Sequence, residues 1–126
     1  LSTGADAHHS FSANYQLDQL VEMEGRVSSF VWRNPLCFLY MEVTTDDGEQ
    51  VTWMLELLNT ILATNVGWTA NTFSVGDVLE FSGNPARTGS KRLRTTRMYR
   101  LTDGFSYYIT NRGLGGPNQT IGTQGL

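Results

Sequence analysis

The sequence predicts an all-β domain with one short helix, whose strands close into a small barrel. Three observations support this prediction. Apolar and polar residues alternate over residues 8–17, and residues 50–57 place apolar side chains on one face, as strands with one buried face do. Helical spacing is confined to residues 58–66. The chain contains thirteen glycines, which favour many turns between the strands.

Length and composition limit the class of protein. The 126 residues suffice for one domain with its own core. Hydrophobic residues make up 40% of the chain, which is too rich for a disordered protein. No apolar run approaches the roughly 20 residues of a spanning helix, so we expect no membrane span. The net charge of −3 excludes a broadly cationic protein, and we expect no nucleic-acid partner.

The N-terminal half predicts four extended segments. Residues 8–17 alternate between apolar and polar side chains, which indicates a half-buried strand. Residues 20–32 follow, and Gly25 within them predicts a bulge or a barrel bend. Residues 36–45 and 50–57 form the next two strands, joined by an acidic turn that contains a glycine.

The C-terminal half begins with the predicted helix over residues 58–66, which a glycine ends. Strands are expected over residues 78–83, 93–101 and 105–109. Residues 111–126 are rich in glycine and have the composition of a tail rather than of a packed element.

These elements predict a domain organisation of an N-terminal arm over residues 1–17, a barrel over 18–110 and a tail over 111–126. Within the barrel, three meandering strands, a short helix and two more strands follow one another. This is the order of an OB-like five-stranded Greek-key barrel with extended arms, and a β-sandwich is the alternative. The predicted core comprises Val27, Val31, Leu39, Met41, Val51, Trp53, Leu55, Ile61, Val78 and Leu101.

Several short motifs occur in a specific order and spacing. They are Ala7-His8-His9-Ser10-Phe11, Gly25-Arg26-Val27, Val31-Trp32-Arg33-Asn34-Pro35, Gly67-Trp68-Thr69, Gly76-Asp77-Val78, Gly83-Asn84-Pro85-Ala86 and Leu101-Thr102-Asp103-Gly104. Together they resemble a family of small secreted bacterial proteins, the domain of unknown function 6152, over about residues 7–104. The resemblance implies a secreted OB-like domain and no particular reaction.

The compartment is predicted from the cysteine count and the N-terminus. Cys37 is the one cysteine, so no intramolecular disulfide can form, and its apolar neighbours predict a buried, inert thiol. The residues Ala5-Asp6-Ala7 have the small-x-small form of a signal-peptidase site, and the chain lacks an initiator methionine. We therefore expect a processed product that is secreted, either extracellular or periplasmic.

The two histidines, His8 and His9, are adjacent and form the candidate metal site. A free amine on His8 together with imidazole would suit Cu(II). Residues 1–7 block that amine, so weak binding is expected, and a surface arm is the simpler interpretation. No other cofactor is predicted.

Six of the nine cations lie in one stretch of fourteen residues. Such a stretch on an OB-like barrel could bind an anionic glycan, although a solvated strand face is the simpler interpretation. The candidate residues are Arg87, Lys91, Arg92, Arg94, Arg97 and Arg100.

Enzymatic motifs are missing: the sequence contains no nucleophile elbow, no HExxH and no phosphate-binding loop. The carboxylates are expected to be solvated charges on strands and turns. The sequence therefore predicts a protein that is not an enzyme.

Two alternating segments could serve as strands that are donated to the sheet edge of a second copy. Their candidate residues are His9, Phe11, Ala13, Tyr15 and Leu17 in the first segment, and Phe105, Tyr107 and Ile109 in the second. The first hypothesis is a secreted structural subunit that self-assembles head to tail into a filament or fibril. The alternative is a monomeric or dimeric binding module for a small ligand, copper or an anionic glycan.

Overall fold

The structure is a computed structural model that describes residues 13–109. Its elements in chain order are β1 (Val21–Val31), β2 (Leu36–Thr44), β3 (Gln50–Asn59), α2 (Thr60–Asn65), β4 (Val78–Pro85), β5 (Arg92–Arg100) and β6 (Phe105–Tyr108). No helix in this part of the chain is both long and apolar enough to cross a membrane.

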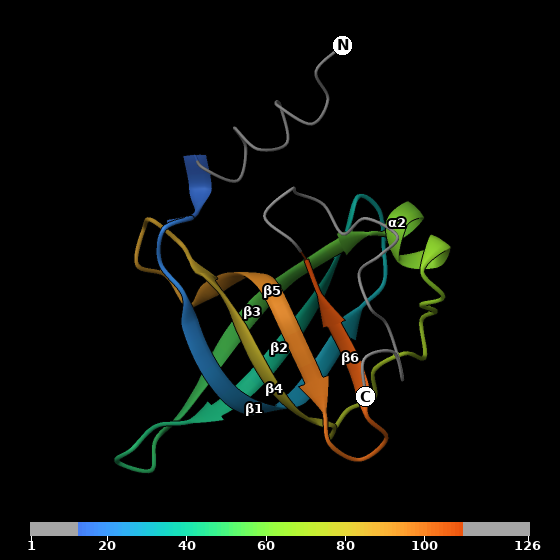
Figure 1. The fold of residues 1–126 in the computed structure, drawn as a ribbon. Coiled ribbons are helices and arrows are strands. Elements are labelled where there is room, and N and C mark those ends of the chain that lie inside the picture. The colour runs from blue at the N-terminus through green and yellow to red at the C-terminus, as the bar shows by residue number, and fades with distance from the viewer. Residues whose placement is uncertain (1–12, 110–126) are drawn as a thin grey trace.

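The strands form one sheet in the order β3-β2-β1-β4-β5-β6, and β5 also pairs with β3 (Figure 1). This second pairing is parallel, whereas the other neighbours are antiparallel. It closes β1 to β5 into a five-stranded mixed barrel. The predicted OB-like fold with one short helix is thereby confirmed.

The sixth strand, β6, pairs with the part of β5 that β3 does not reach. β3 pairs with residues 92–94 at the start of β5, and β6 pairs with residues 97–100 near its end. Both partners therefore use successive parts of the same strand. β6 extends the sheet beyond the point at which β3 and β5 diverge.

The helix α2 is shorter than the predicted stretch of residues 58–66. Leu57 and Leu58 are buried as the last apolar residues of β3, so the strand continues past the expected boundary. The helix starts where the side chain of Asn59 accepts a hydrogen bond from the Leu62 amide, at 2.8 Å. Such a cap satisfies one of the amides that the first turn leaves without a partner.

Of the two features predicted at Gly25, a bulge or a barrel bend, the structure has no bulge at this residue but a close approach of backbones. The pairing of β1 with β2 shifts register between Val27 and Ser29, two residues beyond the glycine. A Cβ atom on Gly25 would lie 2.9 Å from the carbonyl oxygen of Glu42 on β2. The glycine therefore allows β1 to curl against its neighbour.

Side chains from every strand fill the barrel, among them the fully buried Leu39, Leu55, Leu79 and Leu93. The end near α2 is covered by an aromatic cluster. Trp68, which follows α2, lies 5.3 Å from the ring of Phe73 and 5.2 Å from that of Tyr107. This cluster fastens β6 and the loop after α2 to the barrel.

Two residues that the sequence assigned to the core, Ile61 and Leu101, lie at the surface. Ile61 is 72% exposed because Ala63 is the buried residue of α2, which turns Ile61 outward. Leu101 is 63% exposed because β5 ends at Arg100, which places Leu101 in the following turn. Trp53 is only partly buried and packs against the edge of the core.

Truncation of Trp68 should therefore destabilise the protein more than truncation of Trp53. We expect Trp68→Ala to lower the free energy of unfolding by about 3–5 kcal/mol, because it removes a buried ring and leaves a cavity. Trp53→Ala serves as the matched control and should cost about 1–2 kcal/mol. Urea unfolding followed by circular dichroism measures both, and equal losses would contradict this description of the core.

Candidate functional site

The N-terminal segment docks on the barrel where β4 passes into β5. Tyr15 forms an isolated antiparallel bridge with Ala86, just after β4. The Gln16 amide donates to the carbonyl of Pro85 at 2.9 Å, and the Arg87 amide donates to the carbonyl of Asn14 at 2.9 Å. The barrel thus holds this segment through main-chain hydrogen bonds.

The side chain of Tyr15 anchors the segment. It is 3% exposed, and its hydroxyl donates to Oε1 of Glu56 on β3 at 2.7 Å. Burial, together with this carboxylate, raises the pKa of Tyr15 well above its ordinary value. The phenol therefore stays protonated as a hydrogen-bond donor.

The predicted strand over residues 8–17 is wrong in the part that the structure describes. Residues 13 and 14 form a helical turn, and residues 17 and 18 form another turn. Ala13 is exposed and Leu17 is half-buried, so Tyr15 alone of these three side chains reaches the core. His8, His9 and Phe11 lie outside the described residues, and their predicted roles stay predictions.

The second predicted donor strand belongs to its own barrel. Phe105 and Tyr107 are buried in the aromatic cluster, and Ile109 packs against its edge. The Ile109 amide also donates to the carbonyl of Thr96 on β5, at 2.9 Å. β6 is thus paired with β5 and packed against its own barrel.

The six predicted cations do not form one surface. Arg87 and Lys91 are exposed in the loop between β4 and β5, which spans residues 86–91 and which we call the basic loop. Arg97 is exposed on the outer face of β5. The other three are Arg92, Arg94 and Arg100, and each contacts groups on its own barrel.

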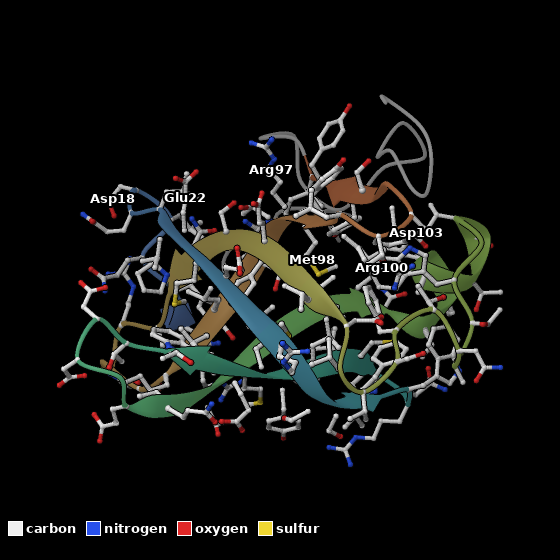
Figure 2. All side chains as sticks on the ribbon, turned by 90° about the horizontal axis from the view of Figure 1, so that it is seen from below. Asp18, Glu22, Arg97, Met98, Arg100 and Asp103 are labelled. Carbon is white, nitrogen blue, oxygen red and sulfur yellow. The ribbon has the colours of Figure 1, made fainter. Side chains whose placement is uncertain are left out.

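Arg100 holds together the turns at the end of the barrel nearest α2. Its guanidinium lies 2.9 Å from the carboxylates of Asp77 and Asp103 and donates to the Thr72 carbonyl at 2.8 Å. Burial by itself lowers the pKa of Arg100, because it disfavours the charged form. The carboxylates of Asp103 and Asp77 have the larger effect, and the pKa is raised. Figure 2 shows Arg100 and Asp103 side by side at this end. These contacts give Arg100 a structural role.

Arg92 and Arg94 lie where β3 meets β5. Arg92 is 3.9 Å from Glu56, and Nη1 of Arg94 donates to Oδ1 of Asn84 at 3.0 Å. Burial lowers the pKa of Arg94. The amide of Asn84 in turn donates to the Gln19 carbonyl at 2.8 Å. These polar groups stabilise barrel closure and the docked N-terminal segment together.

The sequence pattern of one family, described as a family of unknown function and called DUF6152, matches residues 1–94. The chain belongs to this family. No curated protein matches the chain. The DUF6152 match includes the docking site of Tyr15 and the basic loop, and it ends inside β5. The rest of β5 and the whole of β6 follow it.

Metal-ligating side chains do not gather within the described part of this DUF6152 chain. No group of three or more His, Cys, Asp or Glu residues there could hold a metal ion. Cys37 is fully buried in β2, and burial raises the pKa of its thiol, which agrees with its predicted place in the core.

The DUF6152 barrel carries an acidic groove that the sequence analysis did not identify. It holds about 550 Å³ on the outer face of β1, β4 and β5. Spacing of two along β1 predicts that Glu22 and Glu24 share a face, but the register of β1 against β4 is needed to place Glu80 beside them. The charged residues that line the groove are Glu22, Glu24, Glu80 and Arg97, and Met23, Phe81, Ser82 and Tyr99 line it with them.

Because Tyr15 and Tyr107 are buried, we expect the protein to lose stability at alkaline pH. Burial is the main cause of the raised pKa of both Tyr15 and Tyr107. Above the ordinary pKa of 10, the unfolded chain releases these protons while the folded chain retains them. The free energy of unfolding should therefore fall as the pH rises above 10, with Tyr107 contributing up to about 1.4 kcal/mol per pH unit.

Urea unfolding between pH 8 and pH 12 measures this slope. The Tyr107→Phe variant keeps the ring and removes the titrating group, so its slope should be smaller than that of the parent. An unchanged slope in Tyr107→Phe and in Tyr15→Phe would show that neither hydroxyl is the cause.

Proposed function

We propose that this protein is a non-enzymatic structural subunit, secreted to the periplasm or the cell exterior, that self-assembles head to tail by strand addition. The bridge between Tyr15 and Ala86 is the observation that carries this proposal. It identifies the backbone just beyond β4 as a place that accepts an N-terminal segment of this sequence.

Main-chain hydrogen bonds make this contact transferable. The bonds of Asn14 and Gln16 to residues 85–87 join backbone groups, and backbone groups pair in the same way within or between molecules. A turn at residues 17 and 18 connects the docked segment to β1. If that turn opens, the segment can reach the equivalent edge of a neighbouring copy, as in domain swapping.

A head-to-tail contact of this kind joins two different surfaces, so it propagates into a filament when the rotation between copies does not close a ring. The proposal thereby gives the N-terminal segment the donor role and the end of β4 the acceptor role. β6 keeps its place in its own barrel.

The first test is the oligomeric state of the chain and of two truncated forms. We expect the full chain to form large assemblies, seen by light scattering and negative-stain microscopy. Removal of residues 1–17, which include the donor segment, should convert them into monomers with a largely unchanged β-rich circular dichroism spectrum, because the strands of the barrel retain their own pairing. Removal of the C-terminal tail, residues 111–126, should likewise convert the assemblies into monomers if the tail contributes to the contact.

Two results would end the assembly proposal. One is a full chain that stays monomeric at millimolar concentration. The other is a pair of truncated forms that assemble as well as the full chain.

A second candidate function is binding of an anionic glycan, which Lys91 and Trp53 favour. The ammonium of Lys91 lies 5.5 Å from the centre of the Trp53 ring. A cation beside a partly exposed aromatic ring suits a charged sugar, and the loop between the fourth and fifth strands is one that OB barrels use for binding. Tight binding of a sulfated oligosaccharide, lost in Lys91→Ala, with the chain monomeric throughout, would favour this function over assembly.

A further inference from the structure

We propose that the acidic groove on β1, β4 and β5 receives the basic loop of a second copy of this chain. The inference rests on the proposed function, because it names a contact between neighbouring subunits of the same assembly. It is carried by the arrangement of charge on two separate surfaces of the barrel.

The groove is a grid of side chains on three neighbouring strands. The register places Glu22 beside Ser82 and Ser82 beside Arg97, in one row. The next row runs from Glu24 through Glu80 to Tyr99. Figure 2 shows Glu22 and Arg97 projecting toward the same side of the barrel.

None of the carboxylates of this grid forms an ion pair within the described part of the chain. Glu24 and Glu80 face each other directly across β1 and β4, and like charges in that position repel. The ion pairs of residues 13–109 join Arg92 to Glu56 and Arg100 to two aspartates, and none includes Glu22, Glu24 or Glu80. Among the residues that line the groove, three carboxylates thus face one guanidinium, that of Arg97. The next cation on this face of β1, Arg26, donates to the Gly76 carbonyl.

The basic loop has the complementary charge and a suitable shape. Residues 86–91 contain Arg87 and Lys91 and no acidic residue, and Arg92 follows directly. The loop joins two antiparallel strands that pair up to Pro85 and Leu93, so it is the narrow tip of a hairpin. Gly89 makes its tight turn with a φ of +81°.

The loop of one copy cannot occupy its own groove. Its ends are fixed by the pairing of Pro85 with Leu93 and by a hydrogen bond from the Ala86 amide to the Arg92 carbonyl. It therefore lies beyond the end of β4, whereas the grid lies on the outer face around residues 80–82. The loop and the groove that meet must therefore belong to different copies, and a contact between two different surfaces continues from copy to copy unless it closes into a ring.

Charge reversal of each surface provides the test, with the full chain and light scattering as the readout. Glu24→Lys/Glu80→Lys reverses the groove, and Arg87→Glu/Lys91→Glu reverses the loop. Each variant alone should need at least about tenfold more protein to assemble, because like charges then meet at every contact. The control Asp46→Lys/Glu49→Lys makes the same change of net charge in the β2–β3 turn and should assemble as the parent does.

Mixing the two reversed variants should restore assembly. The normal loop of the first meets the normal groove of the second, and the reversed loop of the second meets the reversed groove of the first. Circular dichroism confirms that each variant is folded. Glu24→Gln/Glu80→Gln, which adds no new charge, provides a second groove variant with a smaller expected loss.

The outcomes separate this inference from the proposed function. If the parent assembles and the groove variants behave as the control does, the loop–groove contact is wrong while assembly by strand addition stands. If both reversed variants fail alone and their mixture also fails, the groove takes some other cation and the inference is overturned. A parent that stays monomeric overturns both.

Discussion

Closure of the barrel between β3 and β5 is the constraint on which the rest of the structure depends. Three residue pairs make this parallel contact, with Leu55 beside Leu93 at its centre, and both side chains are fully buried. β5 must cross from β4 to β3 at this point. Gly83 permits the crossing, because a Cβ atom there would lie 2.4 Å from the carbonyl oxygen of Arg94. The curvature of the sheet is thus set by backbone contact.

The same closure gathers polar groups that a small barrel must satisfy internally. Glu56 and Arg94 face each other across β3 and β5, at the last of the three pairs. Partly buried charges are costly unless they are paired and hydrogen-bonded. Tyr15, Arg92 and Asn84 supply these partners. The docked N-terminal segment is therefore part of the way in which the barrel accommodates its own charges, and its position at the end of β4 follows.

Acidic and basic residues lie on different parts of the surface, which the net charge does not reveal. A net charge of −3 suggests a mild, even distribution. The fold instead places on β1 and β4 a group of carboxylates that form no ion pair within residues 13–109, and an acid-free loop at the adjoining end of the barrel. Separation of opposite charges onto different faces favours contacts between copies. In the head-to-tail assembly that we propose, the charges would provide an orientation that strand addition alone does not specify.

The sequence by itself determined the strands from β1 to β6, the short helix after β3 and their order, because periods of two and of 3.6 are local properties of the chain. It also led correctly to the family and to the buried Cys37. Tertiary structure alone decided which charges meet. Glu24 and Glu80 are far apart in sequence, and Arg97 and Arg100 are close, yet the register joins the first two in one groove and separates the second two. Register and burial depend on the whole barrel, and for that reason the alternating arm and the basic stretch could not be assigned from spacing.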